Sequence, residues 1–463
     1  MEALWNRGGN QRRTGRHNSC NGHHNDVTIT LSSEDDDNSI WGYIKSNLSR
    51  HYQPLRDDVR YKERCGRVST VVQTPVEFEK FYLYGSTLCL NALLDIFTFQ
   101  PIRALVALFY ILIRPSCIIH GIRQRLTGSQ ICDVVKIFVF VLCCCIVRHF
   151  DLSVMYHLVR GKAIFNLLVL QSITDLVDGL ISGLGADIWD SLCWKLTQPP
   201  ERRSAYFGVW LHLLLAMVYI LSHTVVILLQ ITALTVALNS HDKLVFTIVL
   251  SSNLVEIKTN MYRRIDRNYL FYIACLDIKE RFHHSLLLFI VSMKIMTDVS
   301  WNPDYLLVIL PDALWILCFE IVADWVKLAF VAKFNKISFH EYHQYRLTLA
   351  TDMTSCRQKL AATDYTDVVS RRIGLNILPM GCVLVLAFSE SFNISGIVGL
   401  GFLTLIFLGL FVVHIVTGTI LRRYETWLLS TTKADDIIEI YPDTDSQMIP
   451  PLEKLRPQIN KDE

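Results

Sequence analysis

The chain has 463 residues, with 45 basic and 43 acidic side chains and a formal net charge of +2 at neutral pH. Hydrophobic residues make up 51% of it and charged residues only 19%, whereas soluble domains carry about 25% charged residues. The balanced charge gives no electrostatic footprint for a nucleic-acid partner. Its 13 cysteines are too few for a secreted disulfide scaffold. The shortage of charge indicates that lipid covers much of the surface.

The hydrophobic residues are concentrated in the middle of the chain, between two polar tails. A soluble core of that length would need more charged cover, but a bilayer does not require it. We therefore predict an all-α, polytopic helical membrane protein with about five to eight membrane-embedded or interfacial helices. The expected divisions are a polar, partly disordered N-terminal region (1–76), a helical membrane domain (77–423) and a polar C-terminal tail (424–463).

Several apolar stretches approach the length needed to cross a bilayer, which takes about 20 helical residues. In chain order they are 81–113, 134–150, 164–186, 205–238, 305–330 and 377–421. Residues 205–238 contain no charged side chain or proline, so we expect one long helix there. A polar segment interrupts the last stretch, which predicts a helical hairpin of 377–389 and 396–421. It ends at Arg422 and Arg423, where the positive-inside rule places a cytosolic boundary.

The connections between these stretches are basic. We expect helical loops at about 258–284 and 331–374, and both contain more Lys and Arg than Asp and Glu. Such loops favour the cytosolic side and contact with anionic lipid. A solvated structural face is the alternative interpretation. The candidate surface for a partner or for lipid headgroups, at the start of the first loop, consists of Glu256, Lys258, Arg263 and Arg264.

Two segments have the pattern of a helix start. Asn302 followed by Pro303 predicts an N-cap and the first helical position. Asp277 with Glu280 predicts a capping box for a helix that begins at Ile278.

Ionisable side chains occur inside the apolar stretches, where charge is costly and normally faces the interior of a helix bundle. In one stretch, Glu320, Asp324 and Lys327 are spaced i, i+4 and i+7 and so share one helix face. Polar packing contacts would explain such residues, and so would a proton or ion path. The candidate intramembrane polar contacts are Asp95, Asp175, Asp178, His212, His223, Glu320 and Asp324.

The most suggestive catalytic pattern is the segment 175–179, which is followed by Asp187 and Asp190. Carboxylates at i and i+3 on a helix could hold Mg²⁺ for phosphate chemistry, and the segment is similar to part of the motif of the CDP-alcohol phosphotransferases. That motif continues with Ala-Arg where this chain has Ser182 and Gly183. The arginine expected on substrate phosphate is therefore missing from the pattern.

Other motifs in the chain stop short of catalytic or metal spacing. His340 and His343 flank Glu341, one residue short of the spacing that places two imidazoles on one helix face. The three consecutive cysteines at 143–145 point to different faces of a helix, so they cannot act together as a metal clamp. We accordingly predict no catalytic residue, no metal site and no cofactor.

Short strings along the chain, in a fixed order, carry a resemblance to a known family. They are residues 155–161, 237–241, 255–258, 277–282, 300–304, 329–335 and 364–367, closing with Arg371 and Arg372. Their order and content resemble the transmembrane anterior posterior transformation protein family. The match covers roughly residues 77–380, the bulk of the apolar region.

The resemblance implies a multi-pass protein of the endoplasmic reticulum membrane without an established catalytic activity. It implies a non-enzymatic scaffold for a membrane partner with a SUN-like domain, in the protection or maturation of newly made proteins. It further implies roles in primary cilium formation and axial skeletal patterning, with a location near the ciliary base. From the residues themselves, two alternatives stay open: a transporter or channel, and a Mg²⁺-dependent lipid phosphotransferase.

Overall fold

The computed structural model describes residues 40–48, 58–113, 127–150, 152–160, 164–197, 203–238, 255, 257–259, 265–357, 365–392 and 396–431. These ranges contain helices and connections and no β-strand, which confirms the all-α class. The chain divides into two compact units, residues 1–62 and 63–463. The described part of the first unit is helix α1 (Ile40–Leu48) and the start of α2.

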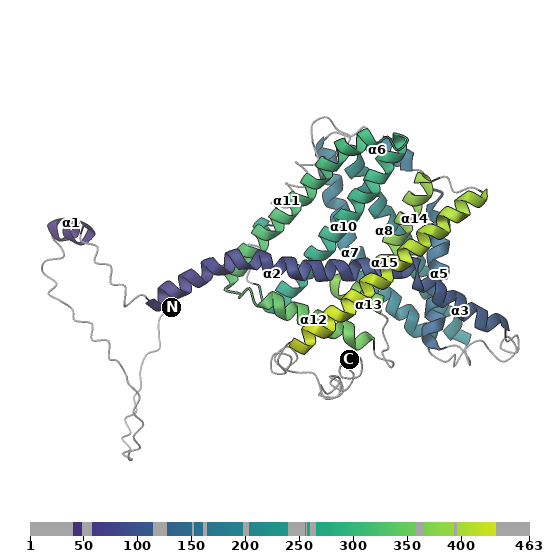
Figure 1. Cartoon of the computed structure of the whole chain (residues 1–463), viewed down its shortest axis with the longest axis horizontal. Coiled ribbons are helices and arrows are strands. Elements are labelled where there is room, and N and C mark those ends of the chain that lie inside the picture. The colour runs from purple at the N-terminus through teal and green to yellow at the C-terminus, as the bar shows by residue number, and fades with distance from the viewer. Residues whose placement is uncertain are drawn as a thin grey trace, which may run out of the picture. The chain divides into compact units, whose positions relative to one another are not determined.

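The second unit is a helical assembly (Figure 1). Its helices, beginning with the rest of α2, are α2 (Asp58–Phe97), α3 (Phe99–Ile113), α5 (Gly128–Val147), α6 (Leu152–Arg160), α7 (Ile164–Thr197), α8 (Arg203–Leu238), α10 (Arg267–Asp298), α11 (Pro303–Asn335), α12 (Glu341–Cys356), α13 (Tyr365–Ile373), α14 (Ile377–Ser391) and α15 (Gly396–Thr431).

Five helical segments in the described ranges are long and apolar enough to cross a membrane. A sixth candidate is the pair α13 and α14, which is bent by 101°. This number agrees with the predicted polytopic membrane protein. The five segments are Val68–Tyr110, Gly128–Val147, Gly208–Leu238, Pro303–Asn335 and Gly396–Thr431.

Several predicted helices occur as expected. The apolar stretch 205–238 forms the single 36-residue helix α8. The two helices of the expected hairpin occur as α14 and α15, although α15 continues beyond Arg423 to Thr431. At the start of α11 the Asn302 side chain accepts a hydrogen bond from the Asp304 backbone, and Pro303 occupies the first turn, which confirms that N-cap.

Helix α10 differs most from the sequence-based expectation. The predicted loop 258–284 is, from Arg267 onward, the first half of one 32-residue helix. The capping box at Asp277 was wrong, because this residue lies in the middle of α10 and is only 2% exposed. Its carboxylate binds Lys327 of α11 and not a helix start. Three of the charged side chains that indicated a loop, Asp277, Lys279 and Arg281, are buried among other helices.

Close approach of the helices depends on small residues at two crossings. A Cβ atom at Gly185 of α7 would lie 2.0 Å from the hydroxyl oxygen of Tyr219 on α8. A Cβ atom at Gly85 of α2 would lie 2.6 Å from the Ile278 side chain on α10. Because a glycine offers no side chain to either neighbour, the helix pairs can pack closely at these points.

Helices α2 and α15 run past each other in opposite directions and are joined at several points (Figure 1). Near one end Tyr84 donates a hydrogen bond to Glu425, at 3.3 Å. Near the other end the Thr98 hydroxyl lies 2.6 Å from Nδ1 of His414. These polar contacts give the pairing of two largely apolar helices a defined register.

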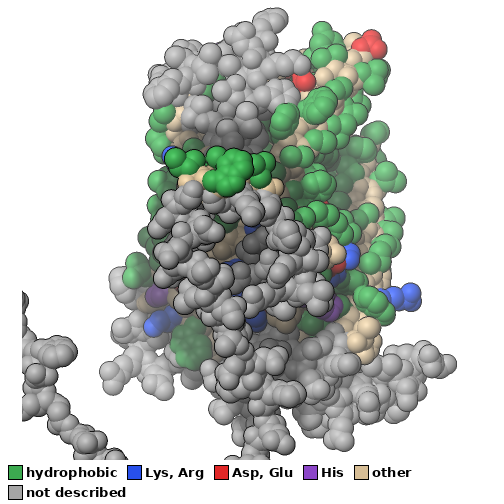
Figure 2. All heavy atoms as spheres, turned by 90° about the vertical axis from the view of Figure 1, so that its left-hand side faces the viewer, with side chains coloured by type: hydrophobic (Ala, Val, Ile, Leu, Met, Phe, Trp, Pro, Cys, Tyr) green, Lys and Arg blue, Asp and Glu red, His purple; other side chains and the backbone are tan. Residues whose placement is uncertain are grey.

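Helices α11 and α15 leave much of their apolar surface uncovered by the rest of the unit. In their most apolar windows only 17% and 6% of the residues are buried, against 50% for α8. Hydrophobic side chains cover much of the described part of the face shown in Figure 2, the side on which α11 lies. In a membrane such faces contact lipid or another membrane protein.

Candidate functional site

The buried ionisable residues gather around α10, where α7, α8, α11 and α2 meet it. Four side chains on α10 are involved, and each is at most 7% exposed. They belong to two groups. The Asp178 cluster consists of Asp175, Asp178, Ser182, His223, Gln230, Lys279 and His283. The Asp324 cluster consists of Glu79, Asp277, Arg281, Asp324 and Lys327. The four residues are Asp277, Lys279, Arg281 and His283.

The Asp178 cluster joins α7, α8 and α10. Lys279 donates to Asp178 at 2.8 Å and to the Ser182 hydroxyl at 2.9 Å. The second carboxylate oxygen of Asp178 lies 2.7 Å from Nε2 of His223. Both oxygens of this carboxylate are therefore bound, one by a cation and one by an imidazole.

Asp175 lies one helical turn from Asp178 and binds amides. Gln230 of α8 donates to Asp175 at 3.0 Å, and Gln171 donates to the same oxygen at 2.8 Å. The carbonyl oxygen of Gln230 lies 3.0 Å from Nε2 of His283 on α10. A single glutamine thus connects Asp175 to α10 through α8.

The Asp324 cluster joins α2, α10 and α11. Arg281 binds Asp324 at 2.9 Å and Glu79 of α2 at 2.8 Å. The guanidinium also lies 4.4 Å from the ring centroid of Tyr82, a cation–π contact. Lys327 lies 2.7 Å from Asp277 and 3.3 Å from Asp324. The cluster therefore alternates acidic and basic groups across three helices.

Glu320 forms a separate pair one turn from Asp324. Its carboxylate lies 2.7 Å from Nδ1 of His284 on α10. The structure places Glu320, Asp324 and Lys327 on one buried face of α11, each bound to a side chain of α10 or beside one. Of the remaining candidate residues, Asp95 lies on α2 and His212 lies on α8.

Asp95 and His212 are separate from both clusters. Asp95 is paired with Arg103 of α3 at 2.9 Å, and Arg103 also lies 3.6 Å from Asp133 of α5. Nδ1 of His212 lies 2.7 Å from the backbone carbonyl oxygen of Gly208, one turn earlier on the same helix. Thus Arg103 of α3 joins Asp95 of α2 to Asp133 of α5, and His212 makes a local contact within α8.

The candidate partner surface cannot be assembled from the described residues. Lys258 is exposed on a short helical segment. Glu256, Arg263 and Arg264 lie outside the described residues. This surface stays a proposal drawn from the sequence.

The carboxylates of the phosphotransferase-like pattern are occupied by bases of the chain itself. Asp178 binds Lys279, whereas Asp190, further along α7, binds Arg371 of α13 at 2.6 Å. Among the described residues no group of three His, Cys, Asp or Glu side chains could hold a metal ion. A Mg²⁺ site at this pattern would require both ion pairs to break.

The residues that sequence reasoning missed are the basic partners. Lys279 and Arg281 fall in the predicted helical loop 258–284, and their acidic counterpart Glu79 lies close to the expected end of the N-terminal region. The sequence did contain a signal: several ionisable side chains in the apolar stretches have no oppositely charged residue within one helical turn. A buried charge needs an opposite charge, so the unpaired carboxylates of α7 required a cation from a distant segment.

The buried ion pairs and hydrogen bonds hold the helices of this unit together. In a low-dielectric interior, ion pairs and hydrogen bonds to charged groups are short and strong, and breaking one leaves an uncompensated charge. A transporter would be expected to show a polar cavity lined by Asp95, Asp175, Glu320 or His223. Two cavities among the described residues, at the α13–α14 bend and at the far end of α14, are lined by other side chains.

Comparison with known proteins places this helical assembly in a family. A profile described as "Eukaryotic membrane protein family" matches residues 126–430. The Xenopus laevis protein "Transmembrane anterior posterior transformation protein 1 homolog" is 40% identical over 385 residues, which are 83% of this chain and 70% of the relative. The chain belongs to the transmembrane anterior posterior transformation protein family.

Other members of the transmembrane anterior posterior transformation protein family show a similar match. The Homo sapiens homolog is 37% identical over 408 residues, covering 88% of this chain and 71% of the relative. A Drosophila melanogaster homolog is 35% identical over 354 residues, covering 76% of this chain and 52% of the relative. No solved structure matches the chain. The family-matched region includes α7, α8, α10 and α11, and so all of both clusters except Glu79.

Proposed function

We propose that the chain is a non-enzymatic scaffold that binds another membrane protein through its membrane-embedded helices. Two observations together carry this proposal. Buried ion pairs hold the interior of the unit together, and the rest of the chain leaves much of the apolar surface of α11 and α15 uncovered. The buried carboxylates of the two clusters are bound by bases or amides of the chain. A rigid interior with an apolar exterior suits a protein whose work is done at its lipid-facing surface.

The two most exposed helices are the proposed sites of partner contact. Leu307 on α11 is 72% exposed and Ile397 on α15 is 91% exposed. Aromatic side chains such as Trp315 on α11 add the large apolar contacts common at protein interfaces. A transmembrane helix of a partner could pack against either face without disturbing the clusters.

Family resemblance supports a more specific form of this proposal. The scaffold would act in the endoplasmic reticulum membrane with a partner that carries a SUN-like domain, and would protect or support newly made proteins. The roles in primary cilium formation and axial skeletal patterning, and a location at the ciliary base, are proposed on the same basis.

Site-specific photocrosslinking in intact membranes tests the scaffold. A photoreactive residue replaces Leu307 or Ile397, and a matched control replaces Ile220, which is fully buried in α8. We expect a membrane-protein adduct of constant mass from at least one exposed position and none from Ile220. Tagged purification after mild solubilisation should recover the same protein in a stoichiometric amount. Recovery of the chain alone, with no adduct at either exposed position, would contradict the scaffold.

A further inference from the structure

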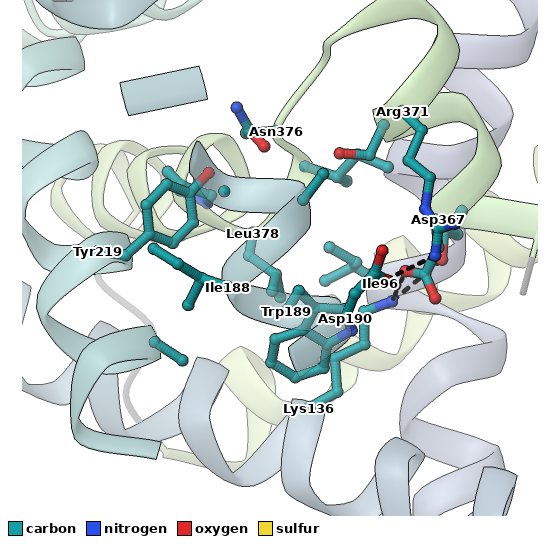
Figure 3. A pocket seen from close by; sticks show the side chains of 17 residues that line it. Ile96, Lys136, Ile188, Trp189, Asp190, Tyr219, Asp367, Arg371, Asn376 and Leu378 are labelled. Atoms are coloured by element: carbon teal, nitrogen blue, oxygen red, sulfur yellow. Dashed lines mark hydrogen bonds and ion pairs between the residues drawn. The ribbon is translucent and has the colours of Figure 1, made fainter. Parts of the chain in front are cut away.

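A cavity of about 50 Å³ lies at the bend between α13 and α14 (Figure 3). Its walls come from α2, α5, α7, α8, α13 and α14, so it lies where several parts of the family-matched region meet. At about 10–15 Å³ for each water-sized atom, it has room for about four such atoms. Its polar lining residues include Lys136, Trp189, Asp190, Asp367, Arg371 and Asn376.

The bend itself brings backbone donors to the cavity. Gly374 has a φ of +81°, the left-handed conformation that favours glycine at a helix end. Its amide donates to the Ser370 carbonyl at 2.9 Å and closes α13. Helix α14 then begins with Asn376 as its N-cap, which makes no side-chain capping bond. The first amides of α14, at Ile377 and Leu378 in the cavity wall, therefore lack a capping side chain.

Two cations and two carboxylates line the cavity. Lys136 binds Asp367 at 3.1 Å and the Thr366 hydroxyl at 3.0 Å. Arg371 binds Asp190 at 2.6 Å. Both ion pairs are visible beside the cavity in Figure 3. The charges balance within the wall, so the two cations are held in place without a ligand.

The wall also contains hydrogen-bond donors that the described residues do not use. Trp189 is only 9% exposed, and its indole N–H has no partner among the described residues. Arg371 uses one N–H of its guanidinium on Asp190, and an arginine has five. Trp189 and Arg371 therefore both line the cavity with N–H groups that are available to a ligand.

We propose that this cavity binds a phosphate oxyanion, supplied by a phospholipid headgroup or by free phosphate. Arg371 presents a planar fork of donors that fits two phosphate oxygens. The Trp189 N–H and the start of α14 supply neutral donors, and helix N-termini favour anions. A tetrahedral group of four oxygens also suits the room for about four water-sized atoms.

The acidic members of the wall do not exclude an anion. Asp190 and Arg371 are each partly exposed, at 38% and 42% of the side chain, so the guanidinium can turn a free edge toward a ligand. Burial raises the pKa of the Asp190 carboxyl above its ordinary value, although Arg371 acts to lower it.

Ligand binding to the purified full-length chain, delipidated in neutral, phosphate-free detergent, tests the proposal by calorimetry. The probes are inorganic phosphate, a short-chain phosphatidic acid, and the matching short-chain diacylglycerol, which lacks the phosphate. Binding of phosphatidic acid but not of diacylglycerol or inorganic phosphate identifies a headgroup site. Equal binding of inorganic phosphate identifies a free-phosphate site. Binding of neither phosphate compound overturns the proposal, as does equal binding of diacylglycerol and phosphatidic acid.

Neighbouring arginines supply a matched pair of variants. Arg371→Gln should weaken phosphate-compound binding by about tenfold or more, because it removes a charge-assisted fork. Arg372→Gln is the control, since Arg372 pairs with Asp352 at 2.7 Å and does not line the cavity. Each change removes one partly exposed ion pair, so thermal unfolding should be affected similarly. Trp189→Phe keeps the ring and removes the N–H, and should weaken binding several-fold. Equal losses in the two arginine variants would overturn the proposed site.

Discussion

Lys279 lies in the middle of the long helix α10, and it is only 7% exposed. Two side chains of α7 bind its ammonium group. Asp178 and Ser182 of α7 both accept from its ammonium within 2.9 Å. The flexible stem of lysine normally carries its charge to water, but here the neighbouring helices replace water. Its contribution to stability therefore depends on its partner: the pair is tolerated as a unit, and either charge alone is not.

Lys279→Met should lower the free energy of unfolding by about 3–5 kcal/mol, because it leaves the Asp178 carboxylate buried without its cation. Reversible unfolding in mixed micelles measures the change. The exposed Lys258 supplies a control, and Lys258→Met should change stability by about 0.5 kcal/mol or less.

The double variant Lys279→Met with Asp178→Asn should recover part of the loss, because no unpaired charge remains. Its amide can still bind His223. If the double variant is as unstable as the sum of both single changes, the ion pair does not account for the effect of Lys279.

At the scale of helices, the α7–α8 pair depends on the absence of a side chain at Gly185. The two helices touch at several points along their length. Asp175 of α7 binds Gln230 of α8 at one point, and Gly185 of α7 lies against Tyr219 of α8 at another. Because the residue numbers rise on one helix as they fall on the other, the pair is antiparallel. Tyr219 is 9% exposed, and its rigid ring has little freedom to yield.

Gly185→Ala should destabilise the protein by about 1–3 kcal/mol through overpacking against the Tyr219 hydroxyl. Gly183→Ala is the control on the same helix, since a Cβ atom there meets nothing within 4 Å. It should instead stabilise α7 by up to about 1 kcal/mol through helix propensity. Thermal unfolding of both variants in one detergent gives the comparison. A similar shift for both would show that α7 and α8 are not in close contact at Gly185.

Helices that depend on local sequence were predictable, and helices that depend on distant partners were not. The uncharged run 205–238 is one helix, and Asn302 with Pro303 is a helix start, because chain composition and capping act within a few residues. The start of α10 was predicted too late, and its burial was not predicted, because its charges resemble those of a loop. Asp178 and Lys279 are 101 positions apart, and no periodicity in one sequence shows that they meet.

For the whole membrane unit, the two ends differ in charge. Figure 1 places α12, α13 and the end of α15 on one side, and the α10–α11 connection and the end of α14 on the other. Near the second side lie three acidic residues, Asp298, Asp304 and Glu390, and one basic residue, Lys294. Positively charged ends stay in the cytosol, so we expect the α12–α13 side to be cytosolic. The basic residues of that side include Lys333, Lys336, Arg371, Arg372, Arg422 and Arg423.

Glycosylation mapping in microsomes tests this orientation. A spaced acceptor sequence inserted at Ser300, in the α10–α11 connection, should be glycosylated because that side is expected to be lumenal. The same insertion at Ser338, between α11 and α12, should stay unmodified. The reverse pattern would invert the orientation, and modification at both positions would contradict a single orientation.

Helix α10 is not among the helices that could cross a membrane by length and composition, and its buried charges constrain the order in which the helices can pack during synthesis. Asp, Lys or Arg at the centre of an isolated helix opposes insertion by about 2.5–3.5 kcal/mol each, and α10 contains Asp277, Lys279 and Arg281 within five positions. Asp178 and His223 have already been synthesised when α10 emerges, so the Asp178 cluster can form at once. Asp324 and Lys327 emerge later, on α11. Arg281 can bind Glu79 of α2, which has also been made by then, whereas Asp277 binds Lys327 on the helix that follows. The buried charges of α10 are therefore fully paired only once α11 has packed against it.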